Sequence, residues 1–197
     1  MKGLSVIILF QVLVGSIVNA QELTIPKFFP ALNSFPLIGM AHGKLSFINT
    51  SEKTLRLLVF ISPECPLCQN YSATLNAIQK QYKQQVRVIG IIPGNAYDFN
   101  TVRGFRKIYK TDFDFYIDSS MELTNYLQAT VTPQVMLLNE SMQLVYSGAI
   151  DNWAVTVGKK RLKATAYYAL DAIENILRQQ PVLVSQTKPV GCKINDF

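Results

Sequence analysis

The feature that most constrains the fold is an apolar run that ends at a pair of cysteines. Residues 55–61 read Leu-Arg-Leu-Leu-Val-Phe-Ile, a pattern typical of a strand buried on both faces of a sheet. Ser62 and Pro63 end this run. Apolar side chains then recur at spacings of three and four, at Cys68, Tyr71, Leu75, Ile78 and Tyr82. This spacing predicts a helix beginning near Cys65. The segment Cys65-Pro66-Leu67-Cys68 therefore lies where a buried strand turns into a helix.

The rest of the chain alternates between strands and helices. Short apolar runs predict strands at 44–48, 86–92, 115–117, 134–139 and 144–150, and longer periodic segments predict helices at 97–110, 120–128 and 159–179. The last two strands are separated by residues 140–142 only, which favours an antiparallel hairpin. Pro181 is expected to stop the last helix. The order predicts an α/β domain with a central mixed sheet flanked by helices.

The two ends of the chain are expected to lie outside this domain. Residues 1–20 have the pattern of a cleaved secretory signal, with Lys2 before an apolar stretch and the small residues Val18 and Ala20 before the cleavage point. An N-terminal membrane anchor is the alternative, because the apolar stretch is close to spanning length. We expect a proline-rich arm at 21–43, the domain at 44–180 and an extended C-terminal tail at 181–197. The mature protein is expected to be soluble and periplasmic or otherwise exported, without stable membrane insertion.

Composition excludes several classes of protein. With 49% hydrophobic and 16% charged residues, the 197-residue chain is neither disordered nor a coiled coil. Its net charge of +6 is distributed without a run of five like charges, which argues against a nucleic-acid partner. Three cysteines are too few for disulfides to hold a fold of this length together. We therefore expect any disulfide to take part in a reaction and not to be a structural cross-link. The sequence predicts no bound cofactor and no metal.

The predicted position of Cys65 gives it a chemical role. Unpaired N–H groups and the helix dipole at a helix N-terminus stabilise a thiolate, which makes Cys65 the expected nucleophile. Cys68 lies one turn later and can attack a mixed disulfide formed by Cys65. Glu64 is a candidate for tuning the thiol, or else an ordinary solvated carboxylate. Asp151 is expected either to cap a turn beside Trp153 or to face the site.

Cys192 is the third thiol, in the predicted tail. About a dozen extended residues at roughly 3.3 Å each would let the tail return to most of the domain. We therefore expect Cys192 to dock near the active site and exchange with Cys65 or Cys68. A third metal ligand and a buried, inert cysteine are the alternatives.

On these residues the chain resembles the thioredoxin superfamily over about 44–179. The resemblance rests on the strand that leads into Cys65-Pro66-Leu67-Cys68, on Thr132-Pro133 before the hairpin, and on the closing helix. It implies that Pro133 is a cis proline beside the cysteines and that Thr132 offers backbone hydrogen bonds to an extended substrate. The chain is most similar to exported redoxins of the AhpC/TSA-like group. It departs from thioredoxin at Val59, where that protein has a buried acid, so the general base stays unassigned.

The resemblance implies an exported thiol–disulfide oxidoreductase that acts on protein or small-molecule thiols and disulfides. A peroxiredoxin-like peroxidase is an alternative: Ser62 meets its requirement for a hydroxyl three residues before the cysteine, whereas Leu58 stands where it needs a proline. An SCO-like copper chaperone is another, with His42 as the distant ligand, but its cysteine pair is spaced by three residues and this pair by two. A structural zinc site lacks a second cysteine pair. A purely structural Cys65–Cys68 disulfide would close too short a loop to stabilise the fold much.

Overall fold

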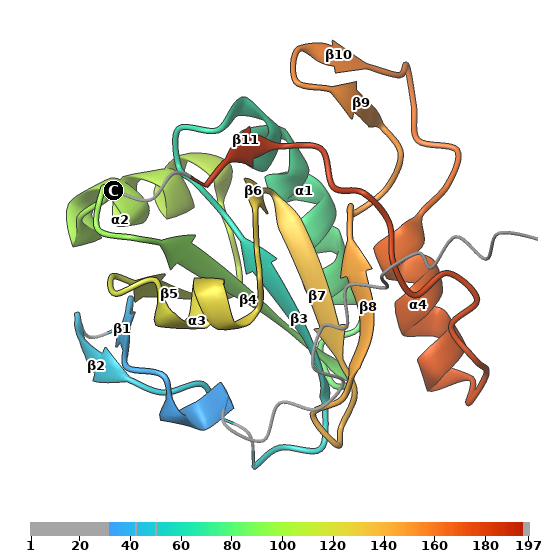
Figure 1. Cartoon of the computed structure of the whole chain (residues 1–197), viewed down its shortest axis with the longest axis horizontal. Coiled ribbons are helices and arrows are strands. Elements are labelled where there is room, and N and C mark those ends of the chain that lie inside the picture. Colours follow the sequence, from blue (N-terminus) through green and yellow to red (C-terminus); the bar gives the residue numbers. More distant parts are fainter. Residues whose placement is uncertain (1–31, 42, 50, 195–197) are drawn as a thin grey trace, which may run out of the picture.

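The computed structural model describes residues 32–41, 43–49 and 51–194. A short 3-10 turn at Leu32–Ser34 precedes four helices and eleven strands in these residues (Figure 1). The helices are α1 (Pro66–Gln81), α2 (Phe99–Tyr109), α3 (Glu122–Tyr126) and α4 (Tyr168–Leu177). The strands are β1 (Leu37–Gly39), β2 (Lys44–Ser46), β3 (Leu55–Phe60), β4 (Val86–Pro93), β5 (Asp114–Asp118), β6 (Val131–Thr132), β7 (Gln134–Leu138), β8 (Leu144–Gly148), β9 (Ala154–Thr156), β10 (Lys159–Lys160) and β11 (Cys192–Lys193).

A seven-stranded mixed sheet forms the centre of the domain. Its strand order is β2-β1-β5-β4-β3-β7-β8. β3 runs parallel to β4 and antiparallel to β7, and all six of its residues are buried. β7 and β8 form the expected antiparallel hairpin. The predicted fold class, a central mixed sheet flanked by helices, is confirmed.

Both faces of the sheet are covered, which explains the continuous apolar run in β3. Leu57 and Val59 point to one face, where they share a core with buried side chains of α1, α2 and α4. Leu58 and Phe60 point to the other, where they pack with α3 and with the segment around Leu37. A strand between two apolar layers has no polar face, so the alternation of a half-exposed strand is absent.

The end of the predicted N-terminal arm belongs to the sheet. β1 lies within 21–43, yet Ile38 pairs with Ile117 of β5, and the Met40 N–H donates to the Phe115 carbonyl at 3.0 Å. The prolines of this arm disfavour regular structure on local grounds. The open edge of β5 supplies the hydrogen-bonding partners that local sequence does not reveal. The sheet therefore begins at Leu37, before the predicted boundary at Lys44.

The prediction of a helix over 159–179 was wrong in its first half. β9 and β10 form a hairpin around Gly158, whose φ of 84° favours glycine, and only residues from Tyr168 onward are helical. The Asn152 side chain holds the intervening loop by accepting from the Thr165 and Ala166 N–H groups. Leu162, within the predicted helix, is 101% exposed, whereas Ala169 and Ile173 on α4 are buried.

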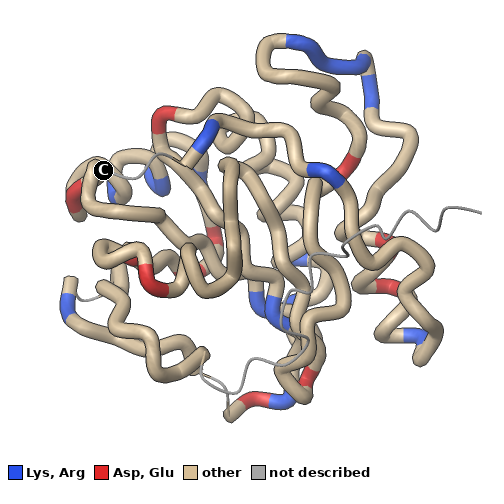
Figure 2. The backbone as a smooth tube through the Cα atoms, viewed as in Figure 1, with Lys and Arg blue, Asp and Glu red and all other residues tan. Residues whose placement is uncertain are grey.

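The β9–β10 hairpin extends away from the sheet and carries a group of basic residues on and directly after β10 (Figures 1 and 2). No helix in the described part of the chain has the length and apolarity needed to cross a bilayer. The predicted signal at residues 1–20 lies outside the described residues.

Candidate active site

Cys65 lies at the junction of β3 and α1, as the sequence predicted. After β3 the chain turns through Ser62, whose carbonyl accepts from the Cys65 N–H at 3.1 Å. Cys65 is the N-cap residue of α1, Pro66 follows in the first turn, and no side chain caps the helix. Because the first N–H groups of a helix have no partner within it, this end of α1 favours negative charge beside the Cys65 sulfur.

Thr132 and Pro133 come to the same place through the sheet. β7 pairs with β3 in a register that sets Gln134 opposite Phe60, so the residues before Gln134 lie beside the end of β3. The Thr132–Pro133 peptide bond is cis, as the resemblance implied. The Thr132 carbonyl oxygen lies 3.1 Å from the Cys65 Sγ.

The C-terminal tail brings Cys192 onto Cys65. The two cysteines form a disulfide across a sequence separation of 127 residues, with their Cα atoms 6.1 Å apart. β11 lies antiparallel to β6, with Cys192 opposite Thr132 and Lys193 opposite Val131 (Figure 1). In this disulfide the Cys65 sulfur carries no hydrogen, so its approach to Thr132 is a van der Waals contact; the reduced thiol could donate there. The expected docking of Cys192 beside Cys65 is present.

Cys68 lies in the first turn of α1 and is a free thiol. Its side chain is fully buried. Burial raises the pKa of the Cys68 thiol from 9.0 to about 12, because the thiolate would lose its hydration. The backbone of Ser62 opposes part of this rise. Cys68 is therefore a protonated, shielded thiol while Cys65 is bonded to Cys192.

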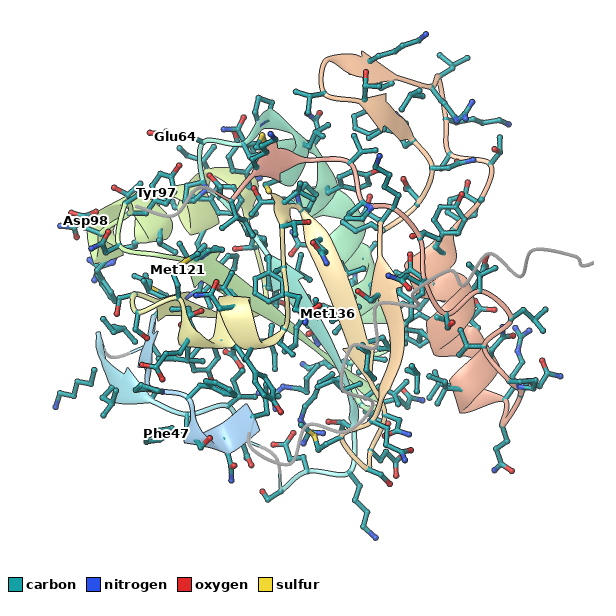
Figure 3. The ribbon with its side chains drawn as sticks, in the orientation of Figure 1. Phe47, Glu64, Tyr97, Asp98, Met121 and Met136 are labelled. Carbon is teal, nitrogen blue, oxygen red and sulfur yellow. A yellow bond between two sulfur atoms is a disulfide. The ribbon has the colours of Figure 1, made fainter. Side chains whose placement is uncertain are left out.

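A pocket of about 300 Å³ opens beside the disulfide. Ser62, Glu64 and Tyr97 are among its lining residues; the Ser62 and Tyr97 hydroxyls lie 2.9 Å apart, and Tyr97 donates to Glu64 at 3.4 Å. Figure 3 shows Glu64 and Tyr97 on neighbouring loops at this edge. Sequence analysis missed Tyr97, since nothing local in the sequence places the loop after β4 against Ser62. Glu64 is exposed, as expected of a loop carboxylate.

Asp151 links α1 to the turn that contains Trp153 through its hydrogen bonds. Its carboxylate accepts from the Tyr71 hydroxyl at 2.5 Å and from the Trp153 N–H at 2.8 Å. Burial and the nearby carboxylate raise the Tyr71 pKa, which keeps this phenol a donor. Trp153 packs edge-on against Tyr71, with ring centroids 5.5 Å apart. Of the two expectations for Asp151, the structure therefore bears out the turn cap.

Metal ligands do not gather in the described part of the chain, where no group of three or more His, Cys, Asp or Glu side chains could hold an ion. His42, the candidate copper ligand, lies outside the described residues.

Neither protein-family models nor curated protein sequences match this chain. Solved structures do. An uncharacterised conserved protein from Geobacillus kaustophilus superposes with a TM-score of 0.73 at 19% identity, over 83% of this chain and 88% of the other. A hypothetical protein from Sinorhizobium meliloti 1021 has a TM-score of 0.71 at 24% identity, over 80% and 88%. A secreted disulfide oxidoreductase from Mycobacterium tuberculosis has a TM-score of 0.51 at 16% identity, over 58% and 83%.

This chain has a thioredoxin-like fold. The resemblance inferred from Cys65-Pro66-Leu67-Cys68 and Thr132-Pro133 is thus confirmed at the level of the fold. Within this thioredoxin-like protein the cysteine pair and the cis proline lie at the end of β3 and the start of β7, and the tail lies over both.

Proposed function

We propose that this thioredoxin-like protein is an exported thiol–disulfide oxidoreductase in which Cys65 attacks and Cys68 resolves. The observation that carries the proposal is the position of the Cys65 sulfur, between the uncapped N-terminus of α1 and the Thr132 carbonyl, where it is already bonded to a cysteine on an extended strand. Its partners are proteins or small molecules that carry thiols or disulfides. An oxidising compartment would allow such a disulfide to persist.

The reaction needs no cofactor. The Cys65 thiolate attacks a partner disulfide, forms a mixed disulfide and releases one partner sulfur as a thiolate. Cys68 then loses its proton and attacks the Cys65 sulfur; the Cys65–Cys68 bond forms, and the second partner sulfur leaves and takes up a proton. The partner gains two electrons, and the protein ends as a disulfide. The same steps in reverse oxidise a partner dithiol.

Thr132 and Pro133 position the substrate in this proposal. The Thr132 carbonyl oxygen lies 3.1 Å from the Cys65 sulfur, and β6 pairs its backbone groups with an extended chain. We assign Glu64 to tuning the reactivity of the Cys65 thiol, because a negative charge at the rim of the pocket disfavours a nearby thiolate.

The two cysteines should differ in their ability to trap partners. In a Cys192→Ser background, Cys68→Ser should accumulate mixed disulfides with a peptide disulfide, and Cys65→Ser should accumulate roughly 100-fold less, because only Cys65 has an accessible thiolate position. Non-reducing mass spectrometry after acid quenching measures both adducts. The Cys192→Ser parent is the matched control and should resolve its adducts. Equal trapping by the two variants, or modification of Cys68 first, would show that the assigned roles are wrong.

Peroxide reduction is the second candidate, because the Ser62 hydroxyl lines the same pocket as Cys65. The Cys65 thiolate would attack hydrogen peroxide to give a sulfenic acid and hydroxide, and Cys192 would condense with it to give the disulfide and water. Leu58 stands where a peroxiredoxin needs a proline, which argues against a peroxidase site.

We therefore expect reduced protein to react with peroxide about as slowly as free cysteine, as followed by loss of thiols in stopped flow. Oxidation of Cys65 more than about 100-fold faster than free cysteine, together with a large slowing in Ser62→Ala, would favour the peroxidase instead.

A further inference from the structure

The C-terminal tail is held on the domain at two separate places. At the first, residues 185–187 lie along β8: the Ser147 N–H donates to the Ser185 carbonyl and the Thr187 N–H to the Ser147 carbonyl, each at 3.0 Å. The Thr187 hydroxyl lies 2.6 Å from the Tyr146 hydroxyl and accepts from the Ala149 N–H at 2.9 Å. These contacts do not depend on the disulfide, so residues 188–194 can leave the site while Thr187 stays in place.

The second place is the edge of β6, where the tail adds a strand. The Cys192–Lys193 strand pairs with Thr132 and Val131, and the Ile194 N–H donates to the Thr130 carbonyl at 3.0 Å. Backbone pairing of this kind is how an extended peptide docks on an exposed strand. The tail thus makes with Thr132 the backbone contacts of a bound polypeptide, and its cysteine sulfur is bonded to Cys65.

Gly191 is the residue that permits this approach. A Cβ built there would come within 2.7 Å of the Thr132 carbonyl carbon and still closer to its oxygen. The obstruction is backbone on both sides, so a side chain cannot be accommodated by a change of rotamer. A strand can occupy this edge with its cysteine on Cys65 only if a glycine precedes that cysteine.

Docking of the tail also closes the site. With β11 in place, Cys65 is 2% exposed and Cys68 is fully buried, so no outside sulfur reaches either atom. We propose that residues 188–194 are an intramolecular substrate that caps Cys65, and that the external substrate of this site is an extended polypeptide segment with glycine directly before its cysteine. The inference rests on the proposed attack by Cys65.

Opening the cap requires no external oxidant or reductant. Cys68 loses its proton and attacks the Cys65 sulfur; the Cys65–Cys68 bond forms, the Cys65–Cys192 bond breaks, and Cys192 leaves as a thiolate that takes up the proton. The number of disulfides is unchanged. Residues 188–194 are then held only by backbone contacts, and an external segment competes with a tethered strand whose effective concentration is on the order of millimolar.

The first experiment tests whether Gly191 controls capping. Gly191→Ala is compared with Gly104→Ala, a matched control in α2 whose added Cβ would meet nothing within 4 Å. Both reduced proteins are oxidised with diamide, and the disulfides are mapped by non-reducing peptide mass spectrometry. Gly104→Ala should form Cys65–Cys192, and Gly191→Ala should form at least roughly tenfold less of it, with Cys65–Cys68 in its place. Equal amounts of Cys65–Cys192 in the two variants would overturn the proposal.

The second experiment tests the substrate class on the full chain with Cys68→Ser and Cys192→Ser, which leaves Cys65 as the one thiol. Two peptides, Val-Gly-Cys-Lys-Ile and Val-Ala-Cys-Lys-Ile, are activated as mixed disulfides with nitrothiobenzoate. The Cys65 thiolate attacks the peptide sulfur and releases coloured nitrothiobenzoate thiolate. The glycine peptide should react at least roughly tenfold faster, and the difference should vanish in urea.

The outcomes separate the two claims. If the folded protein reacts with both peptides at one rate, faster than the unfolded chain, the glycine requirement is wrong while the attack by Cys65 stands. If neither peptide reacts faster with folded than with unfolded protein, the proposed function fails and the inference fails with it.

Discussion

Reducing the Cys65–Cys192 disulfide should lower the free energy of unfolding by roughly 2–5 kcal/mol. The bond joins residues separated by 127 positions, and a cross-link over so long a loop removes much of the conformational entropy of the unfolded chain. Urea unfolding with and without dithiothreitol, followed by circular dichroism, measures the difference. For a chain of this size the melting temperature should fall by about 5–15 °C.

Cys192→Ser supplies the control for this prediction. It should match reduced wild-type protein, and dithiothreitol should not change its stability, because Cys65 and Cys68 close too short a loop to contribute much. If Cys192→Ser were as stable as the oxidised wild-type protein, the long-range disulfide would not be part of the folded state.

Cys68 in the oxidised protein should react with iodoacetamide at least about 1,000-fold more slowly than an exposed cysteine of ordinary pKa, because its thiol is both protonated and fully buried. Burial raises its pKa from 9.0 to about 12, so near neutral pH the thiolate fraction is lower by about three powers of ten. Mass spectrometry of quenched samples gives the rate, and the same protein in urea is the reference. If native Cys68 were labelled at the rate found in urea, its thiol would not be buried in the folded protein.

The raised pKa of Cys68 also has a consequence for stability. The unfolded thiol ionises above about pH 9, while the folded thiol stays neutral until about pH 12. The contribution of the buried, neutral Cys68 thiol to the free energy of unfolding is therefore fully present below pH 9 and declines as the pH rises towards 12. A urea titration at several alkaline pH values follows this decline.

Much of the architecture could be predicted because it depends on near neighbours in the chain. The apolar run in β3 and the three-and-four spacing after Cys65 are local signals, and they predicted a buried strand, a helix and a thiol at their junction. The short turn between β7 and β8 predicted the hairpin in the same way. The length of chain beyond Pro181 sufficed to expect that Cys192 could return to the site.

Local signals failed where a distant partner decided the structure. β1 is a strand because β5 offers it an open edge, although the prolines around it discouraged that interpretation. Residues 159–166 have helix-compatible apolar spacing, but hydrogen bonds to Asn152 and Trp153 hold them in a hairpin and loop. Tyr97 entered the site for the same reason, through packing of the loop after β4 against Ser62.

The sequence by itself determined that a cysteine stands at the start of α1, with a second thiol one turn later and a third within reach. Only the tertiary structure decided which cysteine is bonded to Cys65. The pairing of β11 with β6 brings Cys192 to Cys65, and the absence of a side chain at Gly191 allows the two backbones to approach. Spacing along the chain fixes which atoms can meet, whereas sheet register and close packing fix which of them do.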